Sequence, residues 1–277
     1  MRCLARTPEK AADLKEKGCE IVKGDVLDPE SLTKAMEGVG IAYYLVHSMG
    51  RGATGDFEET DREAATNFAE AAKEAGVKRI IYLGGLGDES KSKHLRSRQE
   101  TAEALQSTGL PMTYLRAAVV VGGGSESFQT IYYLVKRLPA MVTPKWTTIK
   151  TQPIGAEDVV SYLAAAKDLA DEDADRTIEI GGPDVTTYGG MMDEVAKAMG
   201  RRPPLRVAVP LLSPSLSSHW IGLVTPVDTG VARPLVEGLS TETVVRDPSG
   251  MKLFDVEQAS LGSAMKAAVR ELEAERG

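Results

Sequence analysis

Residues 78–121 contain the pattern that decides the fold. Apolar runs stand at Lys78–Leu83 (KRIIYL) and Met112–Val121 (MTYLRAAVVV), and a helical stretch at Leu95–Ser107 separates them. Short buried strands that alternate with amphipathic helices are typical of a parallel sheet covered by helices. The centre of the chain therefore predicts an α/β fold.

The same alternation extends in both directions from this stretch. Upstream we expect strands at Arg2–Arg6 (RCLAR), Cys19–Lys23 (CEIVK) and Ile41–Val46 (IAYYLV), and helices at Pro8–Lys17, 28–37 and Phe57–Ala75, the last of them ended by Gly76. Downstream we expect helices at Phe128–Leu138, Asp158–Lys167, Tyr188–Met199 and Ala259–Glu275, with strands at Thr177–Ile180 and Arg206–Val209. This order predicts a doubly wound, Rossmann-like domain at residues 1–155. A smaller region at 156–277 is expected to complete the sheet and form the substrate side.

Composition narrows the class of protein. The 277 residues include 42% hydrophobic and 26% charged side chains, as in ordinary globular proteins, and the net charge of −7 argues against nucleic-acid binding. No apolar run is long enough to span a membrane, and we expect a cytoplasmic protein. Cys3 and Cys19 provide no disulfide framework, and the three histidines lack the spacing of metal ligands, so no metal is expected.

A glycine pattern at 50–55 matches G-x-G-x-x-G between an expected strand and helix. Three residues separate its first glycine from the strand, whereas a pyrophosphate cradle needs that glycine directly at the strand end. The pattern is therefore open to two interpretations, a dinucleotide loop or a flexible glycine loop.

Polar residues and glycines follow several expected strands, where ligands of open α/β sheets bind. Asp25 and Val26 could contact an adenine or form an Asx turn. His47 and Ser48 could face a ligand or be structural. Gly84 and Gly85 could admit a ligand close to the backbone or serve a tight turn.

His94 and Arg98 are four residues apart and share a helix face if the helix begins early enough. An imidazole beside a guanidinium could donate a proton and hold a ribose or phosphate. The alternative is a solvated polar face.

The order of these pieces resembles the NmrA-like, NAD(P)H-binding atypical short-chain dehydrogenase/reductases of the extended epimerase/dehydratase group. The resemblance runs from Arg2 to about residue 200 and includes RCLAR, GDVLD, YYLVHS, GVKRIIYLGGLG, SRQETAEAL, YLRAAVVVGGGS, QPIGAEDVV and IEIGGPDVTTYGGMM. It implies a Rossmann-like fold and a dinucleotide cofactor.

The resemblance also implies roles for particular residues. Arg6 is similar to the basic residue that meets the 2′-phosphate of NADP(H), which favours NADP(H), with NAD(H) as the alternative. Asp25 and Val26 resemble the adenine pair, whereas Val46, His47 and Ser48 fall beside the nicotinamide ribose. Gly84 and Gly85 stand where a catalytic serine or threonine often lies, and His94 and Arg98 stand on the Tyr and Lys of the catalytic motif. Arg116, Ala117 and Ala118 match the segment that contacts the nicotinamide.

Two departures from the family pattern matter. Arginine keeps a positive charge and cannot titrate as lysine does, so the pair His94 and Arg98 implies a different proton path or none. Family members also begin with a strand and a glycine-rich loop before the RCLAR position. We therefore expect the first βα unit to be missing, with a break in the sheet and weakened cofactor binding.

The expected function is reduction of a small carbonyl or quinone-like acceptor by NAD(P)H. The alternative is a non-catalytic NAD(P) sensor that binds a protein partner. Residues 125–150 and 205–250 are expected to line the substrate pocket, and they carry no signature that identifies the substrate.

Overall fold

The computed structural model describes residues 1–47, 57–88, 92–143, 145–208 and 241–274. Its centre is a four-stranded parallel sheet with the order β10-β5-β4-β3. The strands are β3 (Ile41–Tyr44), β4 (Arg79–Gly85), β5 (Met112–Ala117) and β10 (Arg176–Ile180). The predicted α/β fold with a parallel sheet is confirmed.

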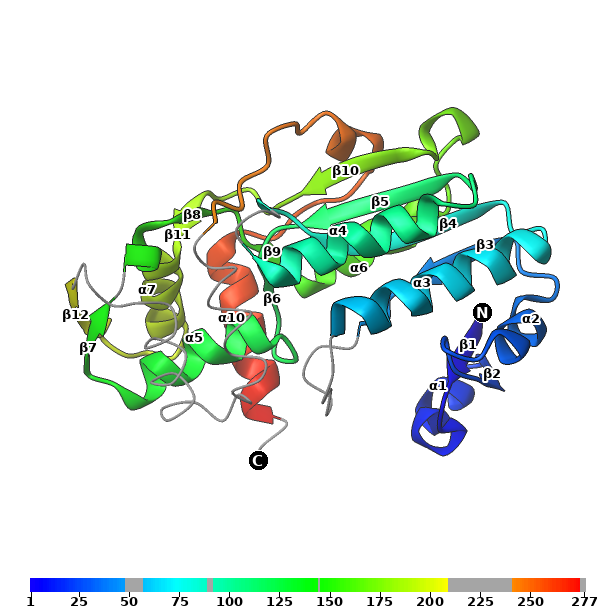
Figure 1. Cartoon of the computed structure of the whole chain (residues 1–277). Coiled ribbons are helices and arrows are strands. Elements are labelled where there is room, and N and C mark those ends of the chain that lie inside the picture. The colour runs from blue at the N-terminus through cyan, green and yellow to red at the C-terminus, as the bar shows by residue number, and fades with distance from the viewer. Residues whose placement is uncertain (48–56, 89–91, 144, 209–240, 275–277) are drawn as a thin grey trace.

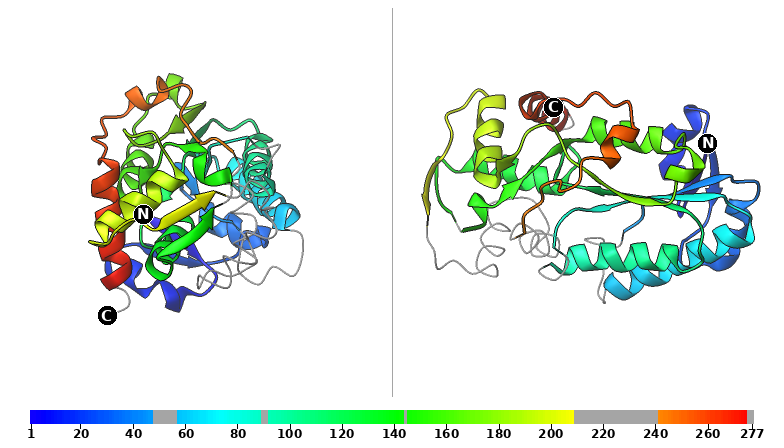
Figure 2. Two further views of the ribbon diagram at one scale, coloured as in Figure 1. Left: turned by 90° about the vertical axis from the view of Figure 1, so that its left-hand side faces the viewer. Right: turned by 90° about the horizontal axis from the view of Figure 1, so that it is seen from above.

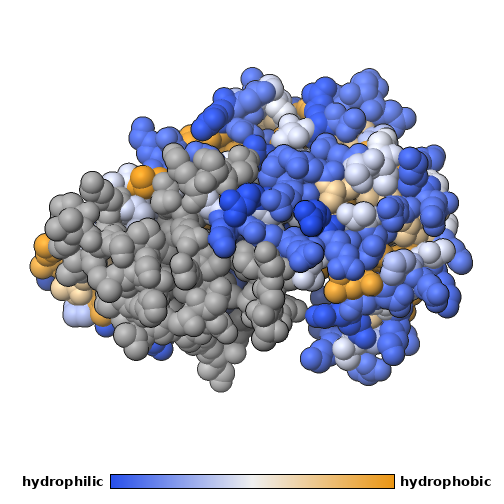
Figure 3. Space-filling view, viewed as in Figure 1, coloured by the Kyte–Doolittle hydropathy of each residue, from blue (hydrophilic) through white to orange (hydrophobic). Residues whose placement is uncertain are grey.

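Helices cover both faces of this sheet (Figures 1 and 2). Helices α3 (Phe57–Glu74) and α4 (Lys93–Gln106) lie on one face, and α6 (Ala156–Ala166) lies on the other. Successive side chains of a strand point to opposite faces, so Tyr82 packs in the cluster of α3 and α4 while Ile81 packs in that of α6. The outer faces of α3 and α4 are mainly hydrophilic (Figure 3).

A row of tyrosines crosses the sheet beneath α3 and α4. Tyr44 pairs in register with Tyr82, and Tyr82 pairs with Tyr114. The ring centroids are 6.0 Å and 5.0 Å apart, and each tyrosine is at least 97% buried. Such cross-strand aromatic pairs stabilise one register, because a slip of one residue would turn these rings to the other face.

The first two strands form a separate parallel sheet. Strand β1 (Arg2–Ala5) pairs with β2 (Glu20–Lys23), and within the described residues neither pairs with the central sheet. The expected break in the sheet therefore lies between β1 and β3. The Arg2 guanidinium donates to the carbonyls of Ala35 and Glu37 at 2.9 and 2.7 Å, and so ties β1 to the end of α2 (Pro29–Met36).

Two expected elements are divided in the structure. Pro8–Lys17 forms a 3₁₀ turn, η1 (Pro8–Ala11), followed by α1 (Ala12–Glu16). The expected strand Met112–Val121 was wrong as a single element, since it becomes β5 and β6 (Val120–Val121). The division has a physical cause, because β5 pairs with β4 and β10 whereas β6 pairs with β9 (Ile154–Gly155).

A second group of helices packs at the carboxyl ends of the central strands (Figure 1). It consists of α5 (Glu126–Arg137), α7 (Tyr188–Ala198) and α10 (Leu261–Ala274), which share one apolar cluster. The remaining short elements are β7 (Ala140–Thr143), η3 (Lys145–Thr148), β8 (Lys150–Thr151), η4 (Asp171–Asp173), β11 (Thr186–Thr187), β12 (Leu205–Ala208) and η5 (Gly250–Leu253).

Arg79 at the start of β4 provides a test of this packing. Its buried guanidinium donates to the carbonyls of Ala166 and Leu169 at 3.0 and 2.9 Å. Arg79→Ala should lower the free energy of unfolding by about 2–3 kcal/mol, because both carbonyls lose a donor in a buried place. Urea denaturation measures this change. The exposed Arg176, paired with Asp173 at 2.7 Å, is the control, and Arg176→Ala should cost less than about 0.5 kcal/mol. Equal losses for the two variants would contradict this assignment.

Candidate functional site

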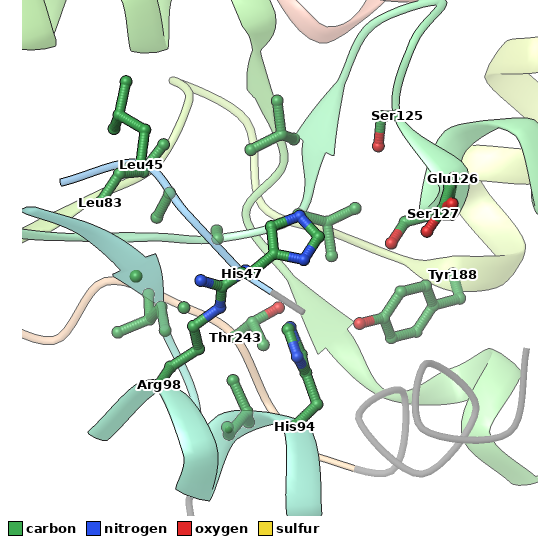
Figure 4. A pocket seen from close by; sticks show the side chains of 18 residues that line it. Leu45, His47, Leu83, His94, Arg98, Ser125, Glu126, Ser127, Tyr188 and Thr243 are labelled. Carbon is green, nitrogen blue, oxygen red and sulfur yellow. The ribbon is translucent and has the colours of Figure 1, made fainter. Parts of the chain in front are cut away.

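A cavity of about 430 Å³ opens at the carboxyl ends of β3, β4 and β5, beside the first turn of α5 (Figure 4). Cavities of this size accept small organic ligands and cofactor fragments. Seven of the sequence-predicted site residues line it: His47, Gly84, Gly85, His94, Arg98, Ala117 and Ala118. The topology therefore brings together residues that are up to 71 positions apart in the sequence (118 − 47 = 71).

Helix α4 presents His94 and Arg98 to the cavity. Ser92 is the N-cap of this helix, and its hydroxyl accepts from the backbone N–H of Leu95 at 3.4 Å, so His94 lies in the first turn. The hydroxyl of Tyr82 donates to the backbone carbonyl of Arg98 at 3.1 Å and fixes the helix over the sheet. The two side chains share a face, as predicted, and that face borders the cavity rather than bulk solvent.

The electrostatic surroundings keep His94 neutral. Burial, the positive charge of Arg98 and the nearby His47 lower the pKa of His94 from 6.5 to about 3. At neutral pH the imidazole therefore carries one N–H donor and one acceptor nitrogen. It can donate a hydrogen bond to a ligand, but it holds no extra proton to release near neutrality.

Gly84 and Gly85 are glycines for a reason of packing. A Cβ atom on Gly84 would lie 2.6 Å from the ring of Tyr114, and one on Gly85 would lie 2.7 Å from Leu95 Cδ2. Both contacts are shorter than van der Waals distance, so a larger residue at either position requires the Tyr114 ring or the end of the Leu95 side chain to shift. The cavity passes along both glycines.

Four other candidates do not line the cavity. Arg6 is exposed at the end of β1, and Val46, although next to His47, does not line the cavity among the described residues. The carboxylate of Asp25 accepts from the Leu27 N–H at 3.0 Å, which is an Asx turn. The carbonyl of Val26 accepts from Asn67 at 3.2 Å. Ser48 and the glycine pattern at 50–55 lie outside the described residues.

Arg116 points to the opposite side from its neighbour Ala117. Its guanidinium donates to the carbonyls of Gly85 and Gly87, at 3.3 and 3.1 Å, and borders a second, smaller pocket with Glu179 and Arg246. Side chains alternate along a strand, and Arg116 lines this second pocket whereas Ala117 lines the first. The structure therefore gives Arg116 a part in holding the turn after β4.

Residues 125–127 and Thr243, which complete the cavity wall, fall within the stretches expected to line the substrate pocket, whereas residues 209–240 of those stretches lie outside the described residues. The sequence did not single out Tyr188, which also lines the cavity. Ser125 caps α5 by accepting from Phe128 N–H at 3.4 Å. Tyr188 is 99% buried and lies beside Thr151 and Thr243. Burial raises the pKa of Tyr188 to about 12. One half of the cavity wall thus comes from β3, β4, β5 and α4. The other half comes from α5, α7 and the segment around Thr243.

Metal-binding clusters and membrane-spanning helices are two further features that the described parts of the chain could contain. Among these residues no group of three histidine, cysteine or acidic side chains is placed to hold a metal ion. None of the described helices is long and apolar enough to cross a membrane.

Known structures share this architecture. A triphenylmethane reductase of Citrobacter sp. complexed with NADP(H) superimposes with a TM-score of 0.73 at 20% identity, over 96% of this chain and 90% of that one. An NADPH-dependent quinone oxidoreductase of Escherichia coli, complexed with NADPH, gives 0.73 at 21% identity, over 95% and 88%. At these identities the likeness establishes the fold.

Sequence relatives agree with the fold. The chain is 25% identical over 246 residues to NADH dehydrogenase [ubiquinone] 1 alpha subcomplex subunit 9, mitochondrial, of Arabidopsis thaliana. The match covers 85% of this chain and 61% of that protein, so the chain spans less than two thirds of this curated relative. The family model described as NAD(P)H-binding matches residues 1–139, half of the 277 residues, and the chain therefore belongs to the NAD(P)H-binding family.

Proposed function

We propose that this protein is an NAD(P)H-dependent reductase of a small carbonyl or quinone-like acceptor. The observation that carries the proposal is the cavity at the carboxyl ends of β3, β4 and β5, where donors from α4 meet small residues of the sheet. This is the place where open α/β sheets bind their ligands. The reductases from Citrobacter sp. and Escherichia coli provide further support for this reaction class.

The residues around the cavity suit the nicotinamide end of a dinucleotide. Arg98 offers a permanent cation and a fork of donors for a ribose or phosphate, and neutral His94 offers an N–H donor beside it. Ala117 and Ala118 leave room for a flat ring. The bound dinucleotide would supply the hydride, and the apolar side chains of Val119 and Val120 would exclude water from the acceptor.

NADP(H) is the cofactor we favour. Arg6 is exposed where β1 ends, and an arginine in such a place can pair with the 2′-phosphate that distinguishes NADP(H) from NAD(H). We place the adenine end of the cofactor near Asp25 and Val26. These residues follow β2, and Arg6 follows the parallel strand β1, so all three lie at the same edge of the small sheet.

A non-catalytic NAD(P) sensor is the second candidate. One observation favours it, because the neutral state of His94 and the glycines at 84 and 85 leave no titrating acid at the usual catalytic positions. The Arabidopsis relative carries the name of a subunit of a larger complex, which agrees with a protein partner.

Turnover separates the two candidates. The full chain should oxidise NADPH in the presence of quinones or small aldehydes and ketones, measured by the loss of nicotinamide absorbance. A protein boiled before assay is the control for the uncatalysed reaction. Tight NADPH binding without turnover over the whole panel would support the sensor and contradict the reductase.

The two arginines should affect the cofactors differently. Arg6→Ala should raise the dissociation constant of NADPH by about tenfold or more and leave that of NADH nearly unchanged, because only NADPH has the 2′-phosphate. Arg98→Ala should raise the dissociation constants of both cofactors alike, by about tenfold. Arg96→Ala is the matched control, since Arg96 lies on the same helix and pairs with Glu58 at 3.0 Å. Titration by NADPH fluorescence measures the dissociation constants, and equal losses of both cofactors in Arg6→Ala would show that Arg6 is structural.

The neutral state of His94 predicts a pH dependence of stability. Between pH 6.5 and about 3 the unfolded chain binds a proton at this residue and the folded chain does not. The stabilisation is therefore complete above pH 6.5 and is lost as the pH falls toward about 3. In the His94→Gln variant, the free energy of unfolding should depend less on pH over this range. Parallel curves for the variant and the wild type would show that the folded protein does protonate His94.

A further inference from the structure

Tyr188 occupies the wall of the cavity that faces His94. It is the first residue of α7, and the side chain of the preceding Thr187 caps that helix by accepting from Gly190 N–H at 3.1 Å. Its ring packs edge-to-face on Trp146, with centroids 5.9 Å apart. Figure 4 shows the phenol group of Tyr188 directed toward the middle of the cavity, above His94. The helix cap at Thr187 and the ring contact with Trp146 together fix the position of the Tyr188 phenol oxygen.

A chain of buried hydroxyls lies behind the phenol. Thr243 Oγ1 donates to Thr151 Oγ1 at 2.8 Å, and both threonines lie near the Tyr188 hydroxyl. Thr151 is fully buried and Thr243 is 5% exposed. The backbone joins these residues as well, through a bridge between Thr151 and Thr243 and the pairing of Thr151 with Thr186, two residues before Tyr188.

The phenol has a proton that it can offer to a ligand. Burial raises the pKa of Tyr188 to about 12, so the hydroxyl keeps its proton at neutral pH. A hydroxyl donates once and can accept twice. Because this hydroxyl is directed into the cavity, it can donate to an oxygen atom of a molecule bound there.

We propose that the Tyr188 hydroxyl binds the oxygen of the acceptor and thereby selects an apolar molecule that carries a carbonyl or quinone oxygen. The inference rests on the proposed function and specifies the substrate half of the same cavity. Val119 and Val120 are apolar residues that line the cavity. Tyr188 supplies a hydrogen-bond donor across from the α4 residues. Hydride addition leaves negative charge on the acceptor oxygen, so a donor at this place also favours the reaction. With a pKa of about 12, the phenol remains a donor over the whole neutral range.

Binding without turnover tests this inference. The protein is first saturated with NADP⁺, which cannot deliver a hydride, and 1,4-naphthoquinone or benzaldehyde is then titrated by calorimetry. Tyr188→Phe should raise the dissociation constant of these probes by about threefold to tenfold, the effect of one lost hydrogen bond. Naphthalene, which lacks the oxygens, should bind the variant and the wild type equally. The dissociation constant of NADP⁺ should not change.

The control is Tyr162→Phe, because Tyr162 is equally buried but its hydroxyl accepts from Gln258 at 3.3 Å on the other face of the sheet. Tyr188→Phe keeps the ring that packs on Trp146, and its unchanged NADP⁺ affinity reports a folded site. Equal affinity of wild type and Tyr188→Phe for the oxygen probes would overturn the inference and leave the reductase proposal standing. A wild type that binds NADP⁺ but neither oxygen probe would overturn both.

Discussion

The parallel register of β3, β4 and β5 is the constraint on which the site depends. The register is held by the row of Tyr44, Tyr82 and Tyr114, which packs against α3 and α4. The same rings shape the cavity. Tyr82 donates to the backbone of Arg98, and the Tyr114 ring fills the space that a side chain at residue 84 would need. The core that stabilises the sheet therefore also sets the position of α4 and the floor of the cavity (Figures 1 and 4).

Much of this arrangement can be predicted from the sequence because it follows from periodicity. Apolar runs separated by amphipathic segments predict the parallel sheet, and the spacing of His94 and Arg98 places them on one helix face. What sequence could not predict is the direction of single side chains where strands end. Arg116 and Ala117 are neighbours, yet only Ala117 faces the cavity. Tyr188 is remote from the other cavity residues in sequence, and only the packing of α7 brings it to them.

The proton chemistry of the cavity differs from that of a tyrosine–lysine pair. In a tyrosine–lysine pair, the charged lysine lowers the pKa of the tyrosine. Here the charge of Arg98 and burial instead hold His94 in its neutral form, while burial keeps Tyr188 protonated. Both groups are suited to donate hydrogen bonds rather than to exchange protons near neutral pH. In our account the site stabilises charge on the acceptor oxygen by donors placed on opposite walls, and solvent supplies the final proton.

The central claim is that the cavity at the carboxyl ends of β3, β4 and β5 holds the nicotinamide end of the cofactor. Hydrogen–deuterium exchange of the full chain, with and without saturating NADPH, tests it most directly. The account predicts slower exchange of the amides in the first turns of α4 and at residues 117–121 and 125–127. Protection confined to the second pocket around Glu179 and Arg246, with none at the first turns of α4, would contradict it.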